Sequence, residues 1–167
     1  HGEGLRRKED HGKLYHGQHV YDNLIHVPLI VWGPGVKPRR FEQPVALIDI
    51  VPTMLELTGL AADRAPPSGV SLVPYLRGAD QPPHPPVFAH KYRPRRGAKI
   101  AMVKWPHKTI WNVARNKWEI YDLSKDPRER NDLSRARPKL QAELAKLVRV
   151  WRSVVLKEIP GRSGGKR

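Results

Sequence analysis

Residues 99–123, KIAMVKWPHKTIWNVARNKWEIYDL, decide the fold of the C-terminal half of this chain. They contain three runs rich in β-branched and aromatic residues: Lys99–Trp105, Lys108–Val113 and Trp118–Leu123. Short runs of this kind joined by tight turns are typical of antiparallel neighbours, so the stretch predicts a meander. Its tryptophans are expected to pack across strands or, alternatively, to form a sugar-stacking face: Trp105, Trp111 and Trp118.

A helix is predicted after the meander. Pro138 suits a first helical position, where its missing N–H costs little. Apolar residues then recur at three- and four-residue intervals: Leu140, Leu144, Leu147, Val148, Trp151 and Val155. We expect this face to pack on the meander, and the basic tail 161–167 to be disordered.

The segment before the meander predicts the end of a larger α/β domain. The run His26–Trp32 has the β-branched density of a buried strand, and Gly33 stops it. Further on, Asp49 is placed to cap a helix that ends at Gly59. A Pro-rich connector follows, so the predicted domains are 1–85 and 86–160, followed by the tail.

The first twenty residues predict a loop that presents side chains, because they are rich in glycine, histidine and charge without periodicity. Four of the eight histidines fall here: His1, His11, His16 and His19. Imidazole binds metals and moves protons near neutral pH, although no pair has the helical spacing of a His-Glu-x-x-His zinc site. An exposed His-rich loop without function is the alternative. We expect His19 and His26 to be packing or strand-edge residues.

Composition leaves two further possibilities open. Thirty-one basic against sixteen acidic residues give a formal charge of +15, which suits nucleic acid, anionic lipid or an acidic polysaccharide. A non-catalytic basic module that binds nucleic acid or anionic polysaccharide is therefore a second hypothesis, although no nucleic-acid recognition motif accompanies the charge. The chain has no cysteine, and no apolar run approaches the roughly 20 residues that cross a bilayer. Because it opens with His1-Gly2 and not Met, position 1 is expected to be internal to a longer protein.

Five ordered blocks resemble the sulfatase family within the alkaline-phosphatase superfamily. The first is HGEGLRRKEDHGKLYHGQHVYDNLIHVPLIVWGPG at residues 1–35, and the second is DIVPTMLELTG at residues 49–59. The third is GVSL with YLRG at residues 69–78, and the last two are EIYDL at 119–123 and DPRERNDL at 126–133. The resemblance spans nearly the whole chain. It implies an α/β fold class: the C-terminal part of an alkaline-phosphatase-like sulfatase sandwich, then a small antiparallel sheet with a C-terminal helix.

The resemblance also implies a site. His1 takes the position of a histidine ligand to a divalent metal, commonly Ca²⁺ in sulfatases, and His16 matches a residue that contacts the sulfate and the leaving oxygen. The nucleophile, a formylglycine formed in a Cys- or Ser-x-Pro-x-Arg motif, is expected in a preceding region, since this chain has no such motif. A fragment without it is expected to be inactive alone.

The implied activity is metal-dependent hydrolysis of a sulfate ester on a sulfated small molecule or glycan. Phosphoester or phosphonate hydrolysis, or phosphoethanolamine transfer, is the alternative within the superfamily. Family analogy predicts a periplasmic or extracellular location. Specific nucleic-acid binding is not expected, and the sequence leaves the oligomeric state open.

Overall fold

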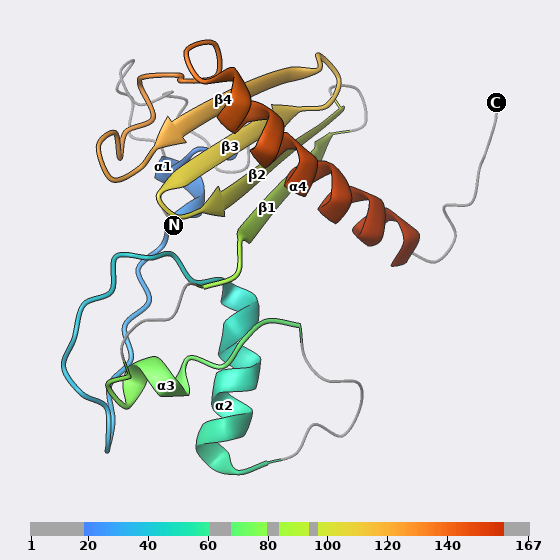
Figure 1. Ribbon diagram of the computed structural model, residues 1–167. Coiled ribbons are helices and arrows are strands. Elements are labelled where there is room, and N and C mark those ends of the chain that lie inside the picture. Colours follow the sequence, from blue (N-terminus) through green and yellow to red (C-terminus); the bar gives the residue numbers. More distant parts are fainter. Residues whose placement is uncertain (1–18, 61–67, 80–83, 94–96, 159–167) are drawn as a thin grey trace. The chain divides into compact units, whose positions relative to one another are not determined.

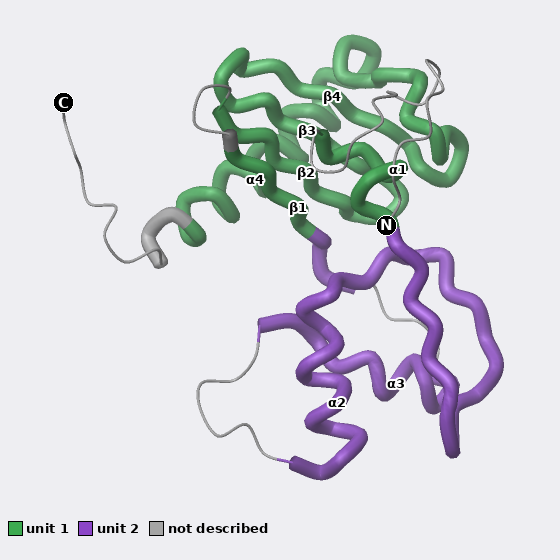
Figure 2. The backbone as a smooth tube through the Cα atoms, turned by 180° about the vertical axis from the view of Figure 1, so that it is seen from behind, with its two compact units in different colours: residues 1–26, 88–167 green, residues 27–87 purple. Residues whose placement is uncertain are grey.

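The computed structural model describes residues 19–60, 68–79, 84–93 and 97–158. By their internal contacts these residues form two compact units, one from residues up to 26 together with those from 88 onward, and one from residues 27–87 (Figure 2). We call them unit 1 and unit 2. The domains 1–85 and 86–160 remain a prediction. The two units are defined by contacts within each one, and such contacts do not show which part of the chain folds independently.

Unit 1 is built on a four-stranded sheet whose strands follow in sequence order (Figure 1). The strands are β1 (Val87–Arg93), β2 (Gly97–Lys104), β3 (His107–Asn112) and β4 (Lys117–Asp122). The pairs β2–β3 and β3–β4 are antiparallel, which confirms the predicted meander. Strand β1 was not predicted, because His90 and Lys91 interrupt its short apolar run directly after a Pro-rich segment.

One face of the sheet is covered by α4 (Pro138–Glu158), which lies across the strands in Figure 1. Alternation along each strand sends every second side chain to this face. The core there joins strand and helix residues: Ile100, Met102, Trp111, Trp118, Ile120, Leu144, Ala145 and Val148. The helix and the face on which it packs are therefore confirmed.

The tryptophans of this face are packing residues. Trp111 and Trp118 are cross-strand partners, and their rings stack with centroids 5.0 Å apart. The guanidinium groups of Arg152 and Arg149 lie over these rings at 5.3 and 5.6 Å. Because both rings are buried, the alternative of a sugar-stacking face is wrong for them.

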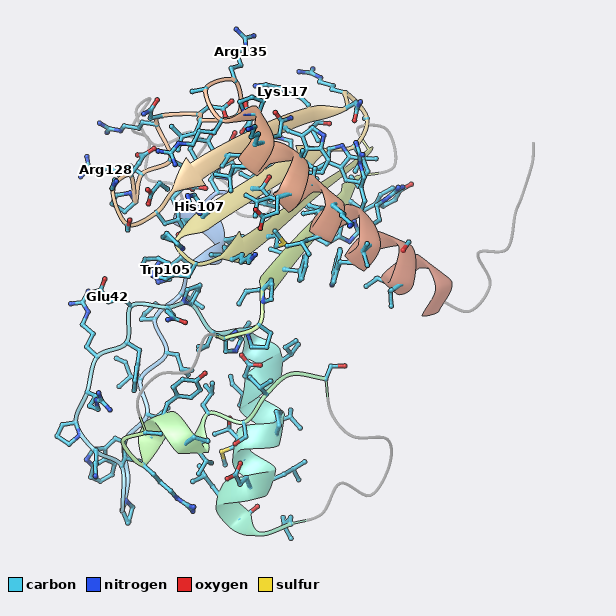
Figure 3. All side chains as sticks on the ribbon, in the orientation of Figure 1. Glu42, Trp105, His107, Lys117, Arg128 and Arg135 are labelled. Atoms are coloured by element: carbon cyan, nitrogen blue, oxygen red, sulfur yellow. The ribbon has the colours of Figure 1, made fainter. Side chains whose placement is uncertain are left out.

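The opposite face of the sheet is covered by residues from the start of the chain. Figure 1 shows α1 (Asp22–Ile25) on the side of the sheet away from α4. The core on this side again joins distant segments: Val20, Ala101, Val103, Ile110, Tyr121 and Leu123. Trp105, labelled with His107 at the β2–β3 turn in Figure 3, packs against the same cluster. The segment 19–25 therefore belongs to the C-terminal sheet, about 80 residues later in the chain.

Unit 2 contains α2 (Ile50–Thr58) and α3 (Val73–Leu76). Gly59 ends α2 in the left-handed conformation, φ 67°, as predicted. The Asp49 carboxylate, 1% exposed, accepts hydrogen bonds from the backbone N–H groups of Ala46 at 2.6 Å and Val70 at 2.9 Å. It makes no capping bond to α2, so that part of the prediction is wrong, because a 3₁₀ turn over Leu47–Asp49 precedes the helix.

Asp49 also explains a glycine in the third sequence block. Gly69 has φ 102°, and an added Cβ would lie 2.6 Å from the backbone oxygen of Ile48 and 2.8 Å from Asp49 Oδ1. Only glycine adopts this backbone without strain and admits so close an approach. The ring of His84 completes the contact, with Nε2 2.9 Å from Asp49 Oδ2.

The predicted strand over residues 26–32 is wrong for the structure described. These residues form no strand, and the side chains of Ile30 and Trp32 are 87% and 94% exposed. An extended segment becomes a strand only when its backbone groups pair with a neighbour, and no described segment pairs with this one.

No helix among the described ranges is long and apolar enough to span a membrane.

We predict that Leu144→Ala destabilises unit 1 by about 2–5 kcal/mol, because Leu144 is 2% exposed at the centre of the α4 core. Val150→Ala on the same helix is the matched control. Val150 is 56% exposed, so its change should stay within about 0.5 kcal/mol. Urea unfolding followed by tryptophan fluorescence measures both, and equal effects would contradict the assigned helix face.

Candidate functional site

The two predicted site residues, the metal ligand His1 and the catalytic residue His16, lie outside the described residues. His19 is the first described residue of the loop predicted for residues 1–20. Its side chain is buried, and its ring lies 5.1 Å from that of Tyr21, so its expected packing role is confirmed. The side chain of His26 is 73% exposed and lies outside any described strand, with Nδ1 3.7 Å from Asp22 Oδ2. The prediction that His26 is a packing or strand-edge residue is therefore wrong.

A buried ionic cluster lies directly after this loop. It consists of Lys108 on β3, Asp22 at the start of α1 and Glu129 in the turn after β4, and we call it the Lys108 cluster. Lys108 Nζ lies 2.5 Å from Asp22 Oδ1 and 2.8 Å from Glu129 Oε1, and the Lys108 side chain is fully buried. The backbone N–H of Asp22 donates to Glu129 Oε2 at 2.6 Å. Three segments far apart in the sequence are thus joined through one ammonium group.

A second polar contact holds the neighbouring residue. The Tyr21 hydroxyl donates to Glu119 Oε2 at 2.5 Å, and the Tyr121 hydroxyl donates to the same oxygen at 3.1 Å. Lys117 Nζ lies 3.1 Å from the other carboxylate oxygen. Lys108 lies two residues before Ile110 on β3, and Glu119 lies two residues before Tyr121 on β4. Side chains two residues apart on a strand share a face, so both point to the sheet face against which Val20 packs.

Burial and hydrogen bonding set the charges in this region. Burial raises the pKa of Tyr21 and of Tyr121, and the carboxylate of Glu119 adds to both rises, so the two hydroxyls stay protonated donors at neutral pH. Burial alone would raise the pKa of Glu119, but hydrogen bonds from Tyr21 and Lys117 outweigh it, and the net shift is downward. Glu119 is therefore a carboxylate at neutral pH.

Glu129 occupies an unusual backbone conformation. Its φ is 54°, in the left-handed region that residues with a Cβ seldom adopt. The turn is held by Asp126, whose carboxylate accepts the backbone N–H groups of Arg130 at 3.1 Å and Asn131 at 2.8 Å. Burial raises the pKa of the Glu129 carboxyl group, and the charge of Lys108 opposes this rise without cancelling it. The Asp-Pro-x-Glu block thus builds a turn that aims one carboxyl group at a buried lysine.

The described residues do not fit the metal that the sulfatase resemblance implies. No group of three or more His, Asp or Glu side chains within the described ranges is arranged to hold a metal ion. The carboxyl groups of Asp22 and Glu129 already neutralise the ammonium of Lys108. These contacts join residue 22 at the start of α1 to β3 and to the turn after β4.

Sequence reasoning identified two members of the Lys108 cluster without assigning them a role, since Asp22 and Glu129 both lie in the quoted blocks. It missed Lys108. The available signal was periodicity, because Lys108 shares the inward alternation of Ile110 on a run predicted to be a buried strand. A charged residue at such a position requires a buried partner of opposite charge.

Comparison with known proteins gives the family. Residues 10–153 match the family model described as N-sulphoglucosamine sulphohydrolase, C-terminal. Delta 4,5-hexuronate-2-O-sulfatase of Bacteroides thetaiotaomicron is 33% identical over 148 residues, which cover 81% of this chain and 29% of that protein. Arylsulfatase K of Mus musculus is 28% identical over 161 residues, which cover 84% and 28%. The chain thus spans less than a third of the length of these relatives.

Solved structures agree with this result. A 2-O GAG sulfatase superposes with a TM-score of 0.69 at 30% identity, over 84% of this chain and 32% of that chain. A phosphonate monoester hydrolase from Silicibacter pomeroyi, 24% identical over 87% of this chain and 32% of that chain, shares the fold with a TM-score of 0.65. These neighbours confirm the predicted α/β fold class, the C-terminal part of an alkaline-phosphatase-like sulfatase. The chain belongs to the sulfatase family, in the group defined by the C-terminal region of N-sulphoglucosamine sulphohydrolase.

Proposed function

We propose that this chain is the C-terminal part of an enzyme that hydrolyses sulfate esters. The observation that carries the proposal is the family match over residues 10–153, together with relatives named as sulfatases at 28–33% identity. The substrate is a sulfated small molecule or glycan. A sulfated uronate-containing glycan is favoured, because the 33% identical relative is named a hexuronate-2-O-sulfatase.

The chain supplies part of the catalytic machinery and does not act alone. It spans 29% of the length of that relative, and it holds neither a cysteine nor a Ser-x-Pro-x-Arg sequence from which a formylglycine nucleophile is made. Large apolar side chains of unit 2 are also exposed, among them Ile30, Trp32, Leu47, Val51 and Met54. Such a surface suits burial against further protein.

Within this proposal His16 protonates the leaving oxygen. Cleavage of the S–O bond leaves negative charge on the departing alkoxide, so a proton donor at that oxygen lowers the barrier. A divalent metal, Ca²⁺ by family resemblance, would stabilise the charge on the sulfuryl oxygens. The described residues offer no metal site, so its ligands would come from outside them, His1 included.

The first prediction from the proposed function concerns the activity itself. We expect the reading frame extended upstream of His1 to encode Asp before His1 and a Cys- or Ser-x-Pro-x-Arg motif, and the extended protein to hydrolyse 4-nitrophenyl sulfate. The 167-residue chain alone should show no activity above buffer. Release of 4-nitrophenol measures both proteins. A preference for a phosphate or phosphonate monoester over the sulfate would replace the proposal with the phosphoryl alternative.

The second prediction concerns the metal. Dialysis of the extended protein against a chelator should abolish sulfatase activity, and added Ca²⁺ should restore it. His1→Ala should raise the Ca²⁺ concentration needed for half-maximal activity by roughly 10-fold, since one ligand is lost. His26→Ala is the control, because the His26 side chain is 73% exposed. Full activity after exhaustive chelation would contradict metal dependence.

The third prediction concerns His16. His16→Ala should lower kcat by roughly 100-fold on an alkyl sulfate, whose alkoxide needs a proton, and much less on 4-nitrophenyl sulfate, whose phenolate leaves without one. The ratio of kcat on the two substrates is the measurement. Equal losses on both would show that His16 is not the proton donor.

A further inference from the structure

The Lys108 cluster is the strongest feature that the proposed chemistry leaves unused. Lys108 is fully buried, and Glu129 is 2% exposed. Both carboxylates reach the same ammonium, at 2.5 and 2.8 Å, and a backbone N–H joins the two acidic residues at 2.6 Å. The following inference rests on the proposed function, because it concerns the segment that follows His16 in the sequence.

Stability alone is a poor reason for such a cluster. Removing charges from water costs so much that a buried ion pair contributes little net stability compared with apolar residues of similar size. Glu129 adds a left-handed backbone, which costs roughly 1–2 kcal/mol for a residue with a Cβ. Strain and buried charge that coincide at one point favour a role in positioning.

The segment that the cluster holds adjoins the His-rich loop. Val20 is 3% exposed in the core of the sheet, Tyr21 bonds to Glu119, and Asp22 is held by both its carboxylate and its N–H. His16 is six residues before Asp22 in the sequence, within about 20 Å of extended chain. A catalytic group displaced by about 1 Å can lose roughly 100-fold in rate, so the fixing of Asp22 bears on the placing of His16.

We infer that Lys108 is a positioning residue, which fixes residues 19–25 on the C-terminal sheet by clamping Asp22 against Glu129. It acts on the reaction through His16 and touches no substrate. The C-terminal sheet is then part of the catalytic apparatus by geometry, although it supplies no reacting group.

The test compares two lysine variants in the extended protein. Lys108→Met keeps an unbranched apolar side chain, one atom shorter, and removes the charge. Lys104→Met is the matched control, because Lys104 on adjacent β2 makes an ion pair with Glu143 at 3.0 Å with both side chains about half exposed. We expect Lys108→Met to lower kcat by roughly 10- to 100-fold on an alkyl sulfate with KM unchanged, and less on 4-nitrophenyl sulfate. Lys104→Met should stay within about twofold.

A double-mutant cycle separates positioning from general damage. If Lys108 acts through His16, Lys108→Met should cost at most about threefold in a His16→Ala background. Additive losses, or a wild-type kcat in Lys108→Met, would overturn the inference. Asp22→Asn keeps the side-chain shape and is read in the same way if Lys108→Met does not fold.

Hydrogen exchange tests the clamp independently of activity. Amides of residues 19–25 should exchange at least roughly 10-fold faster in Lys108→Met than in wild type, while those of β2–β4 keep their rates. Unchanged exchange in residues 19–25 would overturn the inference even if the wild-type protein is an active sulfatase. Faster exchange in a protein without sulfatase activity would support the clamp and reject the proposed function.

Discussion

A buried lysine is the constraint on which unit 1 depends. The Lys108 ammonium lies inside a sheet covered on both faces, and a cation in such a place is tolerated only with anions at contact distance. Asp22 reaches it from the start of the chain and Glu129 from the turn after β4. The ion pairs of this one lysine therefore join α1 and the Asp-Pro-x-Glu turn to the sheet.

The elements decided by local pattern could be predicted from the sequence. The meander and α4 carry their apolar residues at the periods of a strand and a helix, and Gly59 marks the end of α2 by its freedom to adopt positive φ. The wrong predictions concern features that depend on contacts between residues far apart in the sequence. Residues 26–32 have the composition of a strand, but pairing needs a neighbour that no local signal supplies. The position of Asp49 before an apolar run predicts a helix cap. Its carboxylate instead contacts Ala46, Val70 and His84, and the last two lie 21 and 35 residues later in the chain.

The candidate site shows the same division. Resemblance assigned roles to His1 and His16, and these remain predictions, because both lie outside the described residues. The anchor that follows them could be found only in three dimensions, since 107 positions separate Asp22 from Glu129. No sequence pattern states that a lysine between them joins the two. The alternation of Lys108 with Ile110 gives the position of the charge but not the identity of its partners.

The formal charge of +15 includes basic side chains that make contacts within the fold. Lys108 is enclosed, and the guanidinium groups of Arg149 and Arg152 lie over the rings of Trp118 and Trp111, where they cover an aromatic core. Arg39 donates to the backbone oxygens of Gly78 and Ala79 at 3.1 and 3.2 Å. Because these basic residues also make contacts within the fold, net charge alone is a weak argument for a nucleic-acid module. The proposed function rests on the family match over residues 10–153, and the charge of the whole chain adds little to it.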